Sequence, residues 1–194
     1  MARTLYGVLF YTLSLATLVL GKVKLDIYMM SRCPDAVRGM RDMAAVYYDN
    51  IKDVDLKFNY IGELNSNSTY GVACLHGDYE KLGPNAALQL VMCQNRDIKR
   101  IGTYREFIEC LQTDSIANWL TVARCTVGEE GKKLLQENVA NTQKKEIKTS
   151  LTFTLNGQKR CAFDSGHWVA SEDGCPGGGS VPSFDKSIKD LTYK

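Results

Sequence analysis

The sequence carries almost no net charge, no internal repeat and, after its first residues, no apolar run long enough to cross a membrane. Its 194 residues include 24 basic and 22 acidic side chains, so the formal charge is +2. A chain balanced in this way attracts neither nucleic acid nor an anionic lipid surface. The apolar fraction of 44% is that of an ordinary globular protein. Collagen-like chains, disordered chains and strongly basic nucleic-acid-binding domains are therefore excluded as classes.

One apolar run stands at the N-terminus, where Arg3 is followed by apolar residues from Leu5 to Leu20 and then by small Gly21. This order predicts a secretory signal peptide over residues 1–21. The alternative is a retained membrane anchor, but a span needs ~20 apolar residues and this run is shorter. We expect no stable membrane insertion after cleavage, and a protein that is secreted or held in the lumen of a lysosome or vacuole. The sequon that begins at Asn67 predicts a glycosylated surface loop in the same pathway.

Seven cysteines follow the predicted cleavage point, in a chain that we expect to form one domain over residues 22–194. They are Cys33, Cys74, Cys93, Cys110, Cys125, Cys161 and Cys175. In an oxidising compartment most cysteines pair, and an odd number leaves at least one thiol over. Cys74 and His76 have a spacing that suits metal ligation, but no second close pair completes a tetrahedral set. No metal site is therefore predicted.

Alternating polar and apolar residues predict strands over residues 22–29 and 53–60. Between them, apolar residues from Val37 to Tyr47 recur at helical spacing behind Pro34, which suits the first turn of a helix. A strand, a helix and a strand of these lengths favour a parallel pair. Cys33 is therefore predicted to lie where a strand gives way to a helix N-terminus.

The middle of the chain, about residues 62–148, shows helix-start patterns and no convincing strand. Thr103 with Glu106, and Thr126 with Glu129, have the spacing of a capping box. Strand signals return on either side of Asn156-Gly157, which favours a two-residue hairpin turn.

A last amphipathic helix is predicted behind Ser180 and Pro182. The order of elements predicts an α/β fold, namely a thioredoxin-like domain with a helical insertion, stapled by disulfides.

Cys33 is the candidate nucleophile. The free amides and the macrodipole of a helix N-terminus favour an anion, so a thiolate at Cys33 would be stabilised there. The alternative is that Cys33 is a structural half-cystine. The other six cysteines, Cys74, Cys93, Cys110, Cys125, Cys161 and Cys175, are disulfide candidates that allow fifteen pairings. Cys161 and Cys175, which flank the terminal loop, are the one pair that the sequence suggests.

Several motifs, in this order, resemble the gamma-interferon-inducible lysosomal thiol reductase (GILT) family, and look closest to its fungal branch. They are Cys33-Pro34-Asp35-Ala36, Cys74-Leu75-His76-Gly77-Asp78-Tyr79-Glu80, Met92-Cys93-Gln94-Asn95, Lys159-Arg160-Cys161 and Gly166-His167-Trp168. In the second motif, Cys74, His76, Gly77 and Glu80 match the family pattern at the correct spacing. The resemblance implies a thioredoxin-like fold with a helical insertion and the reduction of protein disulfides.

The sequence also departs from the family pattern. The reductase motif has two cysteines separated by two residues, and Ala36 occupies the place of the second. In a dithiol enzyme the second thiol releases the substrate from the mixed disulfide, and an alanine methyl group cannot do this. Gly39 and Lys81 stand where family members have a further cysteine. Leu151 stands where thioredoxin-like domains usually have a cis-proline and where fungal relatives often have a cysteine. The prediction is a single thiolate at Cys33 whose mixed disulfide either stays trapped or is resolved by glutathione or another small thiol.

Two functions follow as hypotheses. The first is a GILT-like thiol oxidoreductase that acts through Cys33 on disulfide-containing or unfolded proteins, with His76 as a candidate base. The alternative is a redox-degenerate secreted binding protein without catalysis, in which His76 only stabilises a turn before Gly77. A cysteine hydrolase would need a histidine base in a protease signature, and neither His76 nor His167 lies in one.

Overall fold

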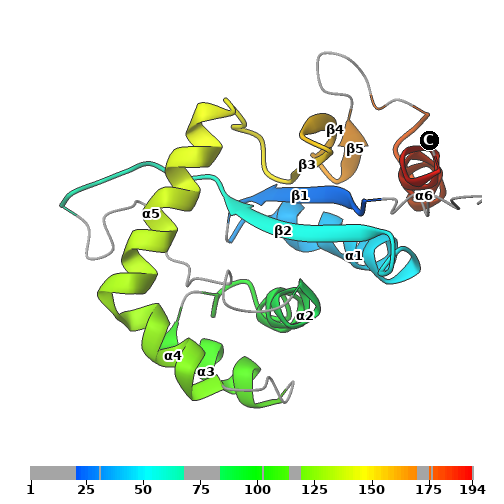
Figure 1. Ribbon diagram of the computed structural model, residues 1–194. Helices are drawn as coiled ribbons and strands as arrows, with labels where there is room; N and C mark the ends of the chain where they lie inside the picture. The colour runs from blue at the N-terminus through cyan, green and yellow to red at the C-terminus, as the bar shows by residue number, and fades with distance from the viewer. Residues whose placement is uncertain are drawn as a thin grey trace, which may run out of the picture.

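A five-stranded sheet in the order β2-β1-β3-β4-β5 forms the centre of the protein (Figure 1). The computed structural model describes residues 21–30, 32–67, 84–101, 103–113, 119–169, 175 and 177–193. The strands are β1 (Val23–Met29), β2 (Val54–Tyr60), β3 (Thr152–Leu155), β4 (Gln158–Asp164) and β5 (His167–Val169). β1 and β2 are parallel, whereas β3 is antiparallel to β1, β4 to β3 and β5 to β4.

β1 and β2 end where the alternating pattern predicted and begin one residue later. Leu25 faces Leu56 and Ile27 faces Phe58 across the parallel pair, and all four side chains are buried. The hairpin between β3 and β4 turns at Asn156-Gly157, whose φ angles of 49° and 82° are both positive. Positive φ at both positions is what a type I′ turn requires, and this explains the Asn-Gly pair.

Two helices, α1 (Pro34–Asp49) and α6 (Val181–Thr192), pack against each other and against the sheet. Residues of α1 at helical spacing are buried, among them Ala36, Met40, Met43 and Tyr47. α6 begins at Ser180, which takes part in a capping box with Ser183. The last helix therefore starts where the sequence predicted, although serine replaces the glutamate or glutamine usual at the third position.

The remaining helices lie between β2 and β3. They are α2 (Pro84–Gln94), α3 (Tyr104–Thr113), α4 (Trp119–Val127) and α5 (Glu129–Lys144). Figure 1 shows α2, α3 and α4 below the sheet, with α5 rising past the end of β2. The fold class predicted from the sequence, an α/β thioredoxin-like domain with a helical insertion and disulfides, is confirmed.

One of the two predicted caps in this region is wrong. Thr103 does accept a hydrogen bond from the amide of Glu106, at 3.3 Å. Thr126, however, lies inside α4, and α5 begins at Gly128 without a side-chain cap. The helices α4 and α5 follow each other too closely for Thr126 to stand at a helix start, and spacing alone does not show this.

Asn138 of α5 satisfies the backbone at the outer edge of β2. Its Oδ1 accepts from the amide of Tyr60 at 2.7 Å, and its Nδ2 donates to the carbonyl of Phe58 at 3.2 Å. Edge strands present unpaired backbone groups that invite association with other chains. A single buried carboxamide therefore satisfies two edge groups and fixes α5 to the sheet.

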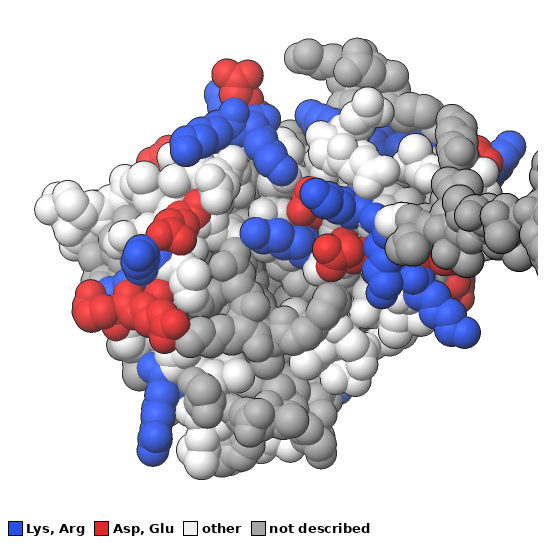
Figure 2. Space-filling view, viewed as in Figure 1, with Lys and Arg blue, Asp and Glu red and all other residues white. Residues whose placement is uncertain are grey.

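Basic and acidic side chains are interspersed on the face shown in Figure 2. Within the described part of the chain, no helix is both long enough and apolar enough to cross a membrane. The predicted signal peptide, except Gly21, lies outside the described residues.

Candidate active site at the start of the first helix

Cys33 occupies the N-cap position of α1, as the sequence predicted. Its carbonyl accepts the first helical hydrogen bond, from the amide of Val37 at 3.1 Å, and Pro34 follows as the first helical residue. The side chain is partly exposed, and its thiol forms no disulfide within the described part of the chain. A partly exposed thiol thus lies at the positive end of a helix dipole.

Asp35 of the same motif points toward the turn between β4 and β5. Its two carboxylate oxygens accept hydrogen bonds from the amides of Ser165 and Gly166, both at 3.1 Å. Two segments separated by 130 residues are joined in this way. Asp35 therefore supports the position of the helix start, a role that the motif alone did not reveal.

Ala36 and Gly39 lie on the buried face of α1. A Cβ atom added at Gly39 would stand 2.9 Å from Cγ of Phe163 and 3.0 Å from Cδ2 of Leu151. These distances leave no room for a side chain. A cysteine at position 39 would fit only if Phe163 and Leu151 moved away from α1, so the place of this further family cysteine is filled by packing.

Leu151 lies just before β3 and is fully buried. The Ser150-Leu151 peptide bond is cis, and Leu151 exchanges backbone hydrogen bonds with Phe163. The hydroxyl of Ser150 accepts a hydrogen bond from the amide of Met30 at 2.8 Å. This segment is therefore attached directly to the strand end that leads to Cys33.

Arg32 connects the Cys33 loop to the helical insertion. It adopts a left-handed conformation, with φ of 56°, and its Nε donates to the carbonyl of Ile101 at 2.8 Å. Beside this contact lies a small cavity of about 10 Å³, with Cys33 and Ala36 in its wall. The insertion thus forms part of the immediate surroundings of the sulfur.

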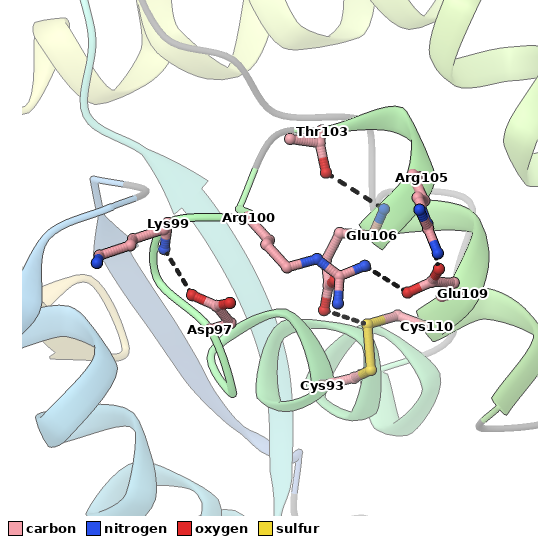
Figure 3. Close-up of polar contacts among 9 residues, drawn as sticks. All are labelled: Cys93, Asp97, Lys99, Arg100, Thr103, Arg105, Glu106, Glu109 and Cys110. Atoms are coloured by element: carbon pink, nitrogen blue, oxygen red, sulfur yellow. Dashed lines mark hydrogen bonds and ion pairs between the residues drawn. A yellow bond between two sulfur atoms is a disulfide. The ribbon is translucent and has the colours of Figure 1, made fainter.

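A cluster of polar side chains lies between α2 and α3, around the disulfide from Cys93 to Cys110 (Figure 3). Buried Glu106 pairs with Arg100 at 2.8 Å, and the exposed Glu109 pairs with both Arg100 and Arg105. Hydrogen bonds from Arg105 and Arg100 lower the pKa of Glu109, and the bond to Glu109 raises the pKa of Arg100. This network holds the turn before α3 against the disulfide.

Cys93, Glu106 and Cys110 bring two sulfurs and a carboxylate within 4.8 Å of one another. The two sulfurs are joined to each other. Cysteine binds a metal as its thiolate, and a disulfide offers none, so in the oxidised protein Cys93 and Cys110 serve as a structural disulfide rather than as metal ligands.

The second disulfide joins Cys161 of β4 to Cys175, the pair that the sequence suggested. Cys125 is buried on α4. Trp168 of the Gly166-His167-Trp168 motif packs against Phe153 and donates to Asp42 at 2.8 Å. The motif therefore contributes to the core beside α1.

Other predicted site residues lie outside the described residues, namely Cys74, His76, Gly77, Glu80 and Lys81. Asn67 is described and exposed, and its amide donates to the side chain of Asn65 at 3.0 Å. The acceptor asparagine of the sequon is thus accessible.

Comparison with known proteins gives the following. The family model for gamma interferon inducible lysosomal thiol reductase (GILT) matches residues 24–129. A structure described as a candidate protein-disulfide isomerase of Pseudomonas syringae is similar, with 12% identity, 89% of this chain and 94% of that chain covered, and a TM-score of 0.51. The oxidoreductase DsbA of Xylella fastidiosa has 14% identity, covers 88% and 84% of the two chains and has a TM-score of 0.48. No curated protein is significantly similar to the chain.

Proposed function

Because the chain belongs to the gamma interferon inducible lysosomal thiol reductase family, we propose that it is a thiol–disulfide oxidoreductase whose attacking group is the thiolate of Cys33. The observation that carries the proposal is the placement of this thiol. Cys33 has no disulfide partner among the described residues, and it is partly exposed at a helix N-terminus. Cys93, Cys110, Cys161 and Cys175 are held in disulfides.

The proposed first step is thiol–disulfide exchange. The Cys33 thiolate attacks one sulfur of a substrate disulfide, a new bond forms between them, and the other sulfur leaves as a thiolate that takes a proton from water. Ala36 offers no second thiol for resolution. The proposed resolving agent is glutathione or another small thiol, which attacks the mixed disulfide and returns Cys33 to the reduced state.

The proposed substrates are disulfide-containing or unfolded proteins in the secretory pathway. We assign His76, from its match to the family pattern, as a candidate base for the step.

We also propose that the signal peptide is cleaved near Gly21 and that Asn67 carries a glycan. A secreted protein that starts after residue 21 and loses mass on glycosidase treatment in the wild type, but not in Asn67→Gln, would support this part.

The experiment that tests the proposal uses the variants Ala36→Cys and Ala36→Ser. Cys33 and Ala36 line the same cavity, so a sulfur at position 36 would face the mixed disulfide. A neighbouring thiol acts at an effective molarity of up to ~10⁵–10⁸ M. We therefore expect Ala36→Cys to reduce a protein disulfide at least about tenfold faster than the wild type at equal glutathione concentration.

Ala36→Ser is the matched control, because it adds a group of similar size without a thiol, and it should show no gain. Cys33→Ser should abolish activity in either background. The alternative function, a binding protein without catalysis, is favoured by the alanine at position 36. It predicts no gain from Ala36→Cys, and that result would contradict the proposed enzyme.

A further inference from the structure

The cavity beside Cys33 is closed on its far side by the helical insertion. Met29 and Val37 line it from the sheet and from α1, while Val91 and Ile101 line it from the insertion. Its volume of about 10 Å³ is close to what one water molecule needs. A carbonyl oxygen is of similar size, so the cavity can receive a single polar atom but not a side chain.

Asn95 lines the same cavity and directly follows α2. Its backbone amide donates to the carbonyl of Val91 at 3.0 Å, which fixes the residue as a continuation of the helix. Its side-chain Nδ2 is buried and has no hydrogen-bond acceptor among the described residues. Buried amide groups in native proteins are nearly always paired, because an unpaired one loses its bond to water without replacement. The side-chain amide of Asn95 therefore lacks an acceptor among the described residues, and a bound ligand could supply one.

A disulfide to α3 fixes the position of the α2 face that lines the cavity. Val91, Gln94 and Asn95 have the spacing of one helix face and line the cavity. Cys93 lies between them in sequence, on another side of α2, and is joined to Cys110 of α3. The disulfide and the bond from Arg32 to Ile101 thus fix the amide of Asn95 relative to the Cys33 loop.

We propose that Asn95 is a substrate-binding residue, whose Nδ2 donates a hydrogen bond to the amide carbonyl oxygen of the disulfide-bearing peptide while Cys33 attacks the disulfide. The inference rests on the proposed function, and it names amide-flanked disulfides as the preferred substrate class. The remaining walls are mainly apolar, and a neutral carbonyl loses less on desolvation than a carboxylate does. The exchange step is the one given above, with one disulfide broken and one formed.

The test compares two small, neutral disulfide probes. One is the disulfide dimer of N-acetylcysteine amide, which has amide carbonyls beside the half-cystine. The other is bis(2-hydroxyethyl) disulfide, which has none. The rate constant for mixed-disulfide formation at Cys33 is measured by mass spectrometry for the wild type, Asn95→Ala and Asn95→Leu, with exposed Asn141→Ala as the matched control.

We expect Asn95→Ala and Asn95→Leu to slow the reaction with the amide probe about 3- to 10-fold, the range for one lost hydrogen bond. The reaction with the hydroxyethyl probe should not change, and Asn141→Ala should leave both rates unchanged. Equal slowing with both probes, or no slowing with either, overturns the proposal, because Asn95 would then only support the fold or bind water. A wild-type protein in which Cys33 reacts with neither probe overturns the proposed function itself.

Discussion

At the scale of single residues, the members of the motif around Cys33 have separate roles. Cys33 presents the thiol, whereas Asp35 is committed to the turn between β4 and β5. Gly39 is required by the close approach of α1 to Phe163 and Leu151. The motif therefore resembles a reductase site in sequence, but in this protein it offers one thiol, that of Cys33. The residues around Cys33 hold the start of α1 in position.

Gly39→Ala provides a prediction at this scale. Helix propensity alone would make the variant more stable by about 1 kcal/mol. The added Cβ would instead meet Phe163 at 2.9 Å, and overpacking of this kind costs about 1–3 kcal/mol. We expect a net loss of stability in urea unfolding. Ala45→Gly, at an exposed position of the same helix, measures the effect of helix propensity alone on the free energy of unfolding. Stabilisation by Gly39→Ala would contradict the close packing.

At the scale of elements, the link between α2 and α3 combines a covalent and an ionic part. The disulfide joins Cys93 to Cys110, and Arg100 pairs with Glu106 and Glu109 beside it. Both parts act on the turn that ends at Ile101, whose carbonyl binds Arg32. The environment of Cys33 therefore depends on an ion-pair network that lies on the insertion.

The network predicts a pH dependence. Hydrogen bonds from Arg105 and Arg100 lower the pKa of Glu109. The stabilisation is therefore fully present above the unfolded-state pKa of about 4.3. It is lost as the pH falls through the lower pKa of the folded state.

Glu109→Gln should lower the urea midpoint at pH 7 and have a smaller effect at pH 3, which is below the unfolded-state pKa of Glu109, so that part of the stabilisation is lost there. Exposed Glu63→Gln serves as the control at both pH values. An effect of Glu109→Gln that is equal at pH 7 and pH 3 would show that the charge of Glu109 does not contribute.

At the scale of the whole molecule, the insertion is bound to the sheet and to the Cys33 loop through residues far apart in the sequence. Asn138 of α5 bonds to β2, and Ile101 accepts from Arg32. The first contact lies at the C-terminal end of β2, and the second lies in the loop that leads from β1 to Cys33. The helical insertion is thus part of the site's architecture, and it supplies the side chain of Asn95 to the cavity.

Local patterns predicted much of this arrangement. Alternation located β1 and β2 to within one residue, and Pro34 marked the first turn of α1. The three-residue strand β5 was missed because so short a segment has no measurable period. The bonds of Asp35 and the position of Asn95 were also missed, since each depends on segments that meet only after folding.

The central claim, that Cys33 carries a thiol that is not part of any disulfide, can be tested directly by peptide mapping of the intact, non-reduced protein after alkylation. The account predicts an alkylated Cys33, a linked pair of Cys93 with Cys110 and a linked pair of Cys161 with Cys175. A peptide in which Cys33 is disulfide-bonded to another cysteine of the chain would contradict it.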